Sequence, residues 1–169
     1  MKFSDIVIFS VIIVGGYTYF SKTTAPTANE KLISQFDKHN IVKQNEWTKG
    51  NVIDGIQVYT AKKDYTIIYS VWLLGKNEAA VTVLADGKMP ESQGVFIISQ
   101  CNQLVMAVTN RKVTDVKDEV LSILEKAGGA DKDKDGVLRA SGEIAGKLFR
   151  VSIREIDSIP AFTCAIKTA

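Results

Sequence analysis

The chain of 169 residues begins with an apolar run, residues 6–20, that contains no charged side chain. A helix needs about 20 residues, each rising about 1.5 Å, to cross a hydrocarbon layer of about 30 Å. Tyr17 and Tyr19 lie near the far end of the run, where aromatic rings favour the membrane interface, and Lys22 follows. We therefore predict that residues 1–21 form a single N-terminal transmembrane helix that anchors whatever the remaining chain folds into.

A cleaved export signal is the alternative interpretation of the same run. Signal peptides end at a site flanked by small residues, and the nearest candidates here are Ala25 and Ala28. Pro26 lies next to one of them and two residues before the other, which suits a peptidase that binds extended chain poorly. A buried helix of a soluble domain is the third interpretation, and the uncleaved anchor is the one that we favour.

The charges around the run leave its orientation open. Lys2 precedes the run, whereas Lys22, Lys31 and Lys38 follow it, so the positive-inside rule does not favour export of the C-terminal part. A very short amino-terminal tail and a Thr/Ala/Pro-rich linker over residues 22–29 favour export instead. We expect a single-pass protein of the inner membrane whose soluble domain, residues 30–169, lies in the periplasm or another extracytoplasmic space.

Composition limits what this domain binds and how it is stabilised. The chain has 21 Lys and Arg against 19 Asp and Glu, and they are interspersed, so it has no basic stripe for nucleic acid. Cys101 and Cys164 are the two cysteines. Outside the cytoplasm they predict one disulfide, which closes a loop of about 60 residues and contributes about 3–4 kcal/mol in the chain-entropy model. In a cytoplasmic domain they would instead be two buried free thiols.

Hydrophobic periodicity predicts an α+β fold, with an antiparallel sheet of about five strands and two or three helices packed on one side. One helix is expected over residues 28–42, with Thr27 or Asn29 at its N-cap, and another from Thr114 at its N-cap to Ala127. Residues 95–108 fit one helix or two strands equally well. Alternating or β-branched runs predict the strands, at residues 56–60, 65–74, 80–84, 149–153 and 162–166.

The sharpest motif is an acidic loop at residues 131–136. An EF-hand calcium loop places oxygen ligands at positions 1, 3 and 5 and glycine at position 6, which Asp131, Asp133, Asp135 and Gly136 match. Position 12 is Gly142 where a bidentate glutamate belongs, so the pattern is incomplete. Calcium is accordingly the one candidate cofactor, and a solvated Asp/Gly turn is the alternative.

No set of residues predicts catalysis. His39 is the only histidine, and no serine, cysteine or aspartate is placed near it by sequence spacing. Trp47 lies in a polar stretch and is the candidate for a partner contact, whereas Trp72, inside an apolar strand, is expected in the core. We therefore expect a protein that is not an enzyme.

The predicted arrangement is similar to accessory subunits of bacterial secretion systems and pili, which combine one anchor with a small extracytoplasmic domain. It resembles type IV pilins in its apolar amino-terminal helix, α/β head and two cysteines, yet no glycine precedes Phe3, and Val7 stands where pilins carry glutamate. The resemblance implies a non-enzymatic interaction domain whose partners are the membrane and other subunits of an envelope complex. A ligand- or calcium-binding module that uses residues 131–135 is the alternative function.

Overall fold

The computed structural model describes residues 26–65, 68–85 and 91–169, and these fold into an α+β domain. A seven-stranded antiparallel sheet carries three α-helices, which confirms the predicted fold class of this part of the chain. The predicted anchor, residues 1–21, lies outside the described residues. Within the described ranges, no helix is long and apolar enough to cross a membrane. The N-terminal transmembrane helix therefore stays a prediction.

The sheet is built from two groups of strands that the chain visits in turn. Helix α2 (Ala28–Lys38) and a short 3-10 helix, η1 (Gln44–Glu46), come first. The first group of strands is β1 (Thr48–Ile53), β2 (Ile56–Asp64), β3 (Ile68–Leu74) and β4 (Glu78–Ala85). Helices α3 (Glu91–Thr109) and α4 (Val113–Gly128) follow, and then β5 (Leu138–Ile144), β6 (Lys147–Ile156) and β7 (Ile159–Lys167). The order across the sheet is β1-β2-β3-β4-β7-β6-β5, so β7 joins the two groups.

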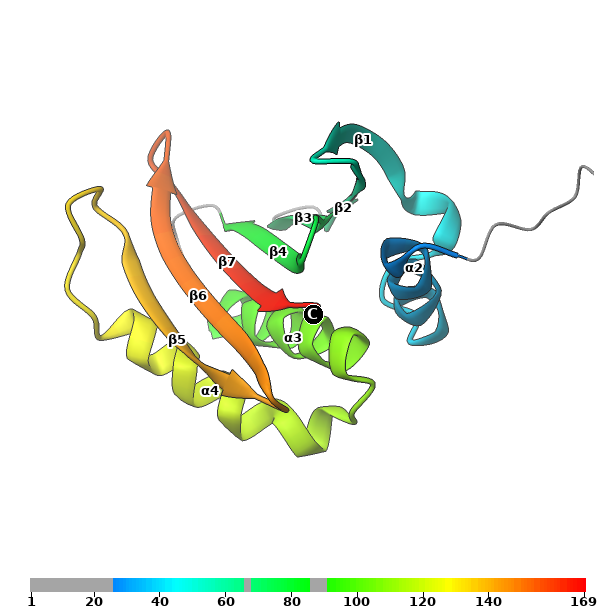
Figure 1. Ribbon diagram of the computed structural model, residues 1–169. Coiled ribbons are helices and arrows are strands. Elements are labelled where there is room, and N and C mark those ends of the chain that lie inside the picture. Colours follow the sequence, from blue (N-terminus) through cyan, green and yellow to red (C-terminus); the bar gives the residue numbers. More distant parts are fainter. Residues whose placement is uncertain (1–25, 66–67, 86–90) are drawn as a thin grey trace, which may run out of the picture.

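The helices cover one face of the sheet, which we call the covered face (Figure 1). Helix α3 contacts β4 and β7, α4 contacts β5 and β6, and α2 contacts β2 and α3. Phe36 of α2 lies with its ring centroid 5.4 Å from that of Trp72 on β3, and it is fully buried. The core between helices and sheet therefore takes residues from both groups of strands, and Trp72 lies in it as predicted.

The two outer helices begin differently. Thr27 Oγ1 accepts a hydrogen bond from the Glu30 backbone at 3.2 Å, and the Glu30 carboxylate accepts one from the Thr27 backbone at 2.8 Å. This capping box shows that Thr27, and not Asn29, is the N-cap of α2. The predicted cap of α4 is wrong: the N-cap is Lys112, two residues before Thr114, and it makes no side-chain cap bond.

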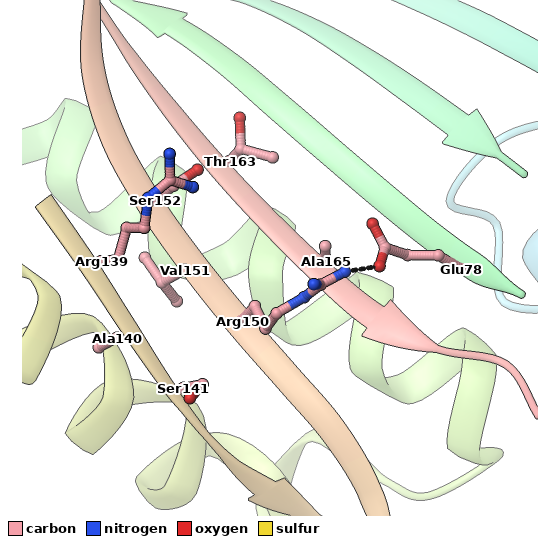
Figure 2. A pocket seen from close by; sticks show the side chains of 9 residues that line it. All are labelled: Glu78, Arg139, Ala140, Ser141, Arg150, Val151, Ser152, Thr163 and Ala165. Carbon is pink, nitrogen blue, oxygen red and sulfur yellow. Dashed lines mark hydrogen bonds and ion pairs between the residues drawn. The ribbon is translucent and has the colours of Figure 1, made fainter. Parts of the chain in front are cut away.

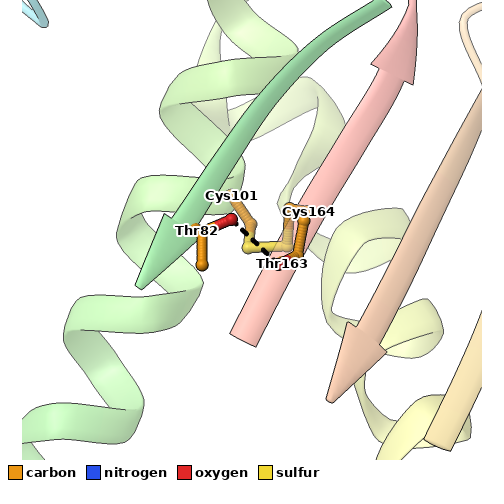
Figure 3. Close-up of a disulfide and its surroundings, with 4 residues drawn as sticks. All are labelled: Thr82, Cys101, Thr163 and Cys164. Atoms are coloured by element: carbon orange, nitrogen blue, oxygen red, sulfur yellow. Dashed lines mark hydrogen bonds between the residues drawn. A yellow bond between two sulfur atoms is a disulfide. The ribbon is translucent and has the colours of Figure 1, made fainter. Parts of the chain in front are cut away.

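The predicted disulfide joins α3 to β7 (Figure 3). Cys101 and Cys164 form it with their Cα atoms 5.7 Å apart, and both side chains are buried in the covered face. On the other side of β7, the hydroxyls of Thr163 and Thr82 lie 2.9 Å apart and hydrogen-bond across β7 and β4 (Figure 3). The disulfide thus connects the helix layer to the centre of the sheet.

The sequence left one segment ambiguous and did not predict two of the strands. The ambiguous residues 95–108 belong to one helix, α3, which is buried against both the sheet and α4. Strands β1 and β5 were not predicted. All six residues of β1 are exposed, so neither of its faces has the apolar alternation that identifies a strand. In β5 the covered-face positions include Ala140 and Gly142, which are too small to mark a buried face.

Because neighbouring strands are antiparallel, the turns gather at two ends of the sheet. We call the end with the turns at residues 54–55, 75–77 and 145–146 the proximal end. Asn29, in the first turn of α2, donates hydrogen bonds to the carbonyls of Gln57 at 2.9 Å and Gly75 at 3.2 Å, so α2 begins at this end. The loop at residues 129–137 and the turn at 157–158 lie at the opposite, distal end.

Candidate functional site

The face of the sheet turned away from the helices, which we call the open face, carries a different set of side chains. Strand register aligns the side chains of this face into rows across six strands. The central row of this face, from β2 to β5, is Lys62, Val71, Thr82, Thr163, Ser152 and Arg139. The next row toward the proximal end is Thr60, Leu73, Ala80, Ala165, Arg150 and Ser141.

Small side chains in the middle of these rows leave the open face hollowed. One hollow of about 430 Å³ lies over β5, β6 and β7, and an adjoining one of about 380 Å³ extends to β3. They share Glu78, Arg139, Ser152 and Thr163, so they form one continuous depression. We call it the open-face groove, and its main lining residues are Val71, Leu73, Glu78, Ala80, Thr82, Arg139, Ser141, Arg150, Ser152, Arg154, Thr163 and Ala165.

Three arginines border the groove on the β5 and β6 side. Figure 2 shows Arg139 extending from β5 toward Ser152, and Arg150 reaching across Ala165 to the Glu78 carboxylate, with which it forms an ion pair. Arg139 Nε donates to the Asp133 carboxylate at 2.7 Å. Arg154 is exposed and makes no ion pair within the described part of the chain. The groove therefore holds more positive than negative charge.

The ion pairs of this border lie close to water. The side chains of Arg139 and Arg150 are 58% and 48% exposed, and exposed pairs of this kind contribute little to stability. The guanidinium hydrogen bond of Arg139 still lowers the pKa of Asp133, because it favours the charged carboxylate. A guanidinium presents several donors in one plane, so each arginine can also bind an incoming carboxylate.

The other side of the groove is apolar. Val71 and Leu73 of β3 face it, and Leu73 is 38% exposed although the covered face of the same strand is buried. Between the two sides lie Ala80 and Ala165, whose methyl groups leave room for another chain. The groove thus combines guanidinium groups, hydroxyls and apolar side chains along an extended path, which suits binding of an extended segment.

The hydroxyls of the groove are not close to the histidine of the chain. The hydroxyls of Ser141, Ser152 and Thr163 lie on the open face. His39, which is the only histidine of the chain, ends α2 on the covered face. The sheet separates the hydroxyls from the imidazole, so none of these hydroxyls has the histidine as a general base.

The acidic loop, residues 131–136, lies at the distal end beside the groove. Asp133 Oδ1 accepts from the backbone of Asp135 and of Val137, each at 2.9 Å, and its other oxygen binds Arg139. Gly136 has the left-handed φ of +74° expected at the turn position. Nowhere in residues 26–65, 68–85 or 91–169 do three His, Cys, Asp or Glu side chains converge as a metal site.

Calcium binding by Asp131, Asp133 and Asp135 therefore stays a prediction. Calcium would have to displace Arg139 to use both oxygens of Asp133, because the guanidinium already binds one of them. Thermal unfolding of the chain with calcium and with a chelator tests it, since a ligand that binds only the folded state raises the melting temperature.

Trp47, the other candidate from the sequence, lies away from the groove. Its ring centroid is 5.4 Å from that of Phe36 in an edge-on contact, and its side chain is half-buried against the core. Its indole nitrogen is buried without a hydrogen-bond partner among the described residues. The structure thus gives Trp47 a packing role, and a partner contact at its exposed edge stays a prediction.

Sequence reasoning did not find the groove as a site. In the sequence, Arg150 and Arg154 alternate with apolar residues, a pattern typical of the exposed face of a strand, and they lie on the open face of β6. Their meeting with Glu78 and Thr82 depends on β7 lying between β4 and β6, and strand order of this kind cannot be read from local patterns. The usable signal was the small-residue alternation of Ala161, Thr163 and Ala165 in a central strand.

Comparison with known proteins adds no relative. No protein-family model matches the chain, and neither the curated proteins nor the solved structures contain a significant match.

Proposed function

We propose that the chain is a non-enzymatic, single-pass membrane protein whose extracytoplasmic domain binds another protein through the open-face groove. The observation that carries this proposal is a sheet with one face covered by helices and the other left open, hollowed and bordered by three arginines. An antiparallel sheet of this kind needs only one covered face for stability, so the second face is available for binding.

Two features support the proposed location. The uncharged run at residues 6–20 has nearly the length of a membrane span. The buried disulfide between Cys101 and Cys164 is a bond that persists in oxidising compartments and is rare in the cytoplasm. Together they favour a domain held at the outer surface of the inner membrane, where subunits of an envelope assembly such as a secretion or pilus system are the proposed partners.

The chemistry of the groove defines the segment that it would bind. Arg139, Arg150 and Arg154 favour carboxylates, and Val71 and Leu73 favour apolar side chains about three strands away. Ala80 and Ala165 allow a backbone to approach the sheet surface between them. We therefore propose an extended partner segment that combines acidic with apolar residues.

A reporter fusion tests the location. An enzyme that is active only outside the cytoplasm, joined to the carboxyl end of the full chain, should be active in cells, and the chain should fractionate with membranes. The same reporter joined to a chain without residues 1–21 should be inactive. A cytoplasmic reporter signal from the full chain would contradict the proposal.

Peptide binding tests the groove itself. A labelled short peptide that alternates Glu with Leu should bind the full chain in nanodiscs, and the same peptide with Lys in place of Glu should not. Arg154→Glu should weaken binding about tenfold, which corresponds to about 1.4 kcal/mol. Arg154 is the best position because no ion pair of the described residues is lost with it.

The matched control is Arg111→Glu, which changes net charge equally. Arg111 is exposed in the connection between α3 and α4, in the layer that covers the opposite face of the sheet. It should leave peptide affinity unchanged. Equal binding of the acidic and basic peptides, or equal losses in the two variants, would contradict binding in the groove.

A further inference from the structure

The turn between β1 and β2 exposes apolar side chains that no described residue covers. Val52, Ile53 and Ile56 are 62%, 55% and 38% exposed, and they surround the two turn residues. Asp54 and Gly55 both have left-handed φ angles, of 50° and 77°, as in a two-residue type I′ turn. We call Val52, Ile53 and Ile56 the hairpin tip. Ile53 and Ile56 pair across the hairpin and share one face, whereas Val52 points to the other, so the hairpin tip is apolar on both faces.

The hairpin tip lies where the described chain begins. A hollow of about 180 Å³ is lined by Thr27 and Asn29 from the start of α2, by Ile56 next to the turn, and by Lys76 from the β3–β4 turn. The buried amide of Asn29 hydrogen-bonds to the carbonyl of Gln57, the residue after Ile56. The start of the domain and the hairpin tip are thus fixed to one another.

Covalent geometry limits how far the hairpin tip can lie from the apolar run. Seven residue steps separate Phe20 from Thr27, and an extended chain covers at most about 3.5 Å per residue, so the span is at most about 25 Å. If residues 6–20 lie in a bilayer, Thr27 lies within that distance of its surface, and the hairpin tip lies beside Thr27 across the shared hollow. This is the nearest apolar surface to which the hairpin tip has access.

The proximal and distal ends of the domain also differ in charge. Within two residues of the proximal turns and at the end of β7, Lys76, Lys147 and Lys167 balance Asp54, Glu78 and Glu143, so this end is neutral. The distal loop and turn are negative on the same count, with five acidic residues against three cations: Asp131, Asp133, Asp135, Glu155 and Asp157 against Lys132, Lys134 and Arg139. An anionic lipid surface attracts nearby lysines and repels carboxylates. The proximal end is therefore the end suited to face a membrane.

We infer that the hairpin tip is a second membrane contact, in which Val52 and Ile53 enter the interfacial layer of the bilayer that holds residues 6–20. The inference rests on the proposed anchor. With both contacts made, the proximal end faces the lipid and the distal end points away from it. The open-face groove then faces sideways, parallel to the membrane surface, and is accessible to other membrane-anchored chains.

A depth measurement on the full chain tests this contact. The chain is placed in nanodiscs of equimolar phosphatidylcholine and phosphatidylglycerol, with an environment-sensitive fluorophore attached at Ile53→Cys. The native cysteines are joined in a disulfide, so the label goes to the new thiol. The expected result is a blue-shifted emission that nitroxide-labelled lipids quench.

Ile159→Cys is the matched control, because Ile159 is 43% exposed at the start of β7, next to the distal turn. Its label should stay unshifted and unquenched. Adding Val52→Asp and Ile56→Asp to the Ile53 probe should abolish quenching while the melting temperature stays unchanged. If the chain is recovered with nanodiscs but neither label is quenched, or both labels are quenched equally, the membrane contact of the hairpin tip is contradicted. The proposed anchor is not contradicted by that result. Failure to recover the chain with lipid would overturn the anchor, and this inference with it.

Discussion

Two adjacent rows of residues cross the sheet on opposite faces and have opposite characters. The covered row is Ala61, Trp72, Val81, Cys164, Val151 and Ala140. Its neighbour on the open face is Lys62, Val71, Thr82, Thr163, Ser152 and Arg139. Trp72, Val81 and Cys164 are at most 1% exposed, whereas every residue of the second row is at least partly accessible. Because one residue step separates the rows, substitutions at neighbouring positions can separate stability from binding.

Phe149 and Leu148 test the comparison with the largest expected effect. Phe149 of β6 is fully buried on the covered face, so Phe149→Ala should lower the free energy of unfolding by about 3–5 kcal/mol. Leu148 precedes Phe149 and is 42% exposed, so Leu148→Ala should change the free energy of unfolding by less than about 0.5 kcal/mol. Urea unfolding followed by circular dichroism measures both, and similar losses would show that the faces are not distinct.

Cys164 and Thr163 form the second pair. Replacing Cys101 and Cys164 together with Ala should lower the free energy of unfolding by about 2–4 kcal/mol, because the bond closes a loop between residues 63 apart in sequence. Thr163→Val removes one hydrogen bond on the open face and should cost about 0.5–1.5 kcal/mol. Reductant should destabilise the native chain but not the alanine variant, and equal sensitivity of the two would argue against the bond.

Gly142 and Ser141 sharpen the comparison at the edge strand β5. A Cβ on Gly142 would lie 2.7 Å from Ile123 Cδ1 and 3.0 Å from Ile123 Cγ1, so α4 packs directly on this glycine. Gly142→Val should therefore lower the free energy of unfolding by about 1–3 kcal/mol. Ser141 points to the groove, so Ser141→Val should lower the free energy of unfolding by less than about 0.5 kcal/mol. Thermal unfolding checks both, and a tolerated valine at Gly142 would contradict the close packing.

Substitutions at Asp133 and Asp131 should have the smallest effect on stability, and the effect at Asp133 should depend on pH. The hydrogen bond from Arg139 lowers the pKa of Asp133, so its contribution to stability is present above the ordinary aspartate value and is lost as pH falls through the lowered one. Asp133→Asn should lower the melting temperature at neutral pH, and the difference from the native chain should shrink in acid. Asp131 forms no hydrogen bond or ion pair in the described structure, so Asp131→Asn is the control at each pH.

Local patterns were enough to predict elements whose two faces differ. Val116, Val120 and Ile123 recur at helical spacing and are buried in α4, and Phe149 and Val151 alternate with exposed residues in β6. The patterns failed where both faces share one character. Strand β1 is exposed throughout, and α3 is buried on nearly every side because it packs against both the sheet and α4.

The groove could not be predicted for a different reason. Its residues belong to β3, β4, β5, β6 and β7, and the segments on either side of it are separated by two helices in the chain. In each strand, the sequence pattern of these side chains predicts only an ordinary solvent-exposed face. Only the insertion of β7 between β4 and β6 brings Arg150 to Glu78, and that pairing depends on tertiary structure.

The central position of β7 also bears on how the protein is made. Until this strand emerges from the ribosome, β4 and β6 each present an unpaired edge, and Cys101 has no partner. The two halves of the sheet therefore cannot merge before β7 is available, and completion of this fold waits for that strand. Export in an unfolded state, with oxidation of the thiols on arrival, is compatible with this order of events.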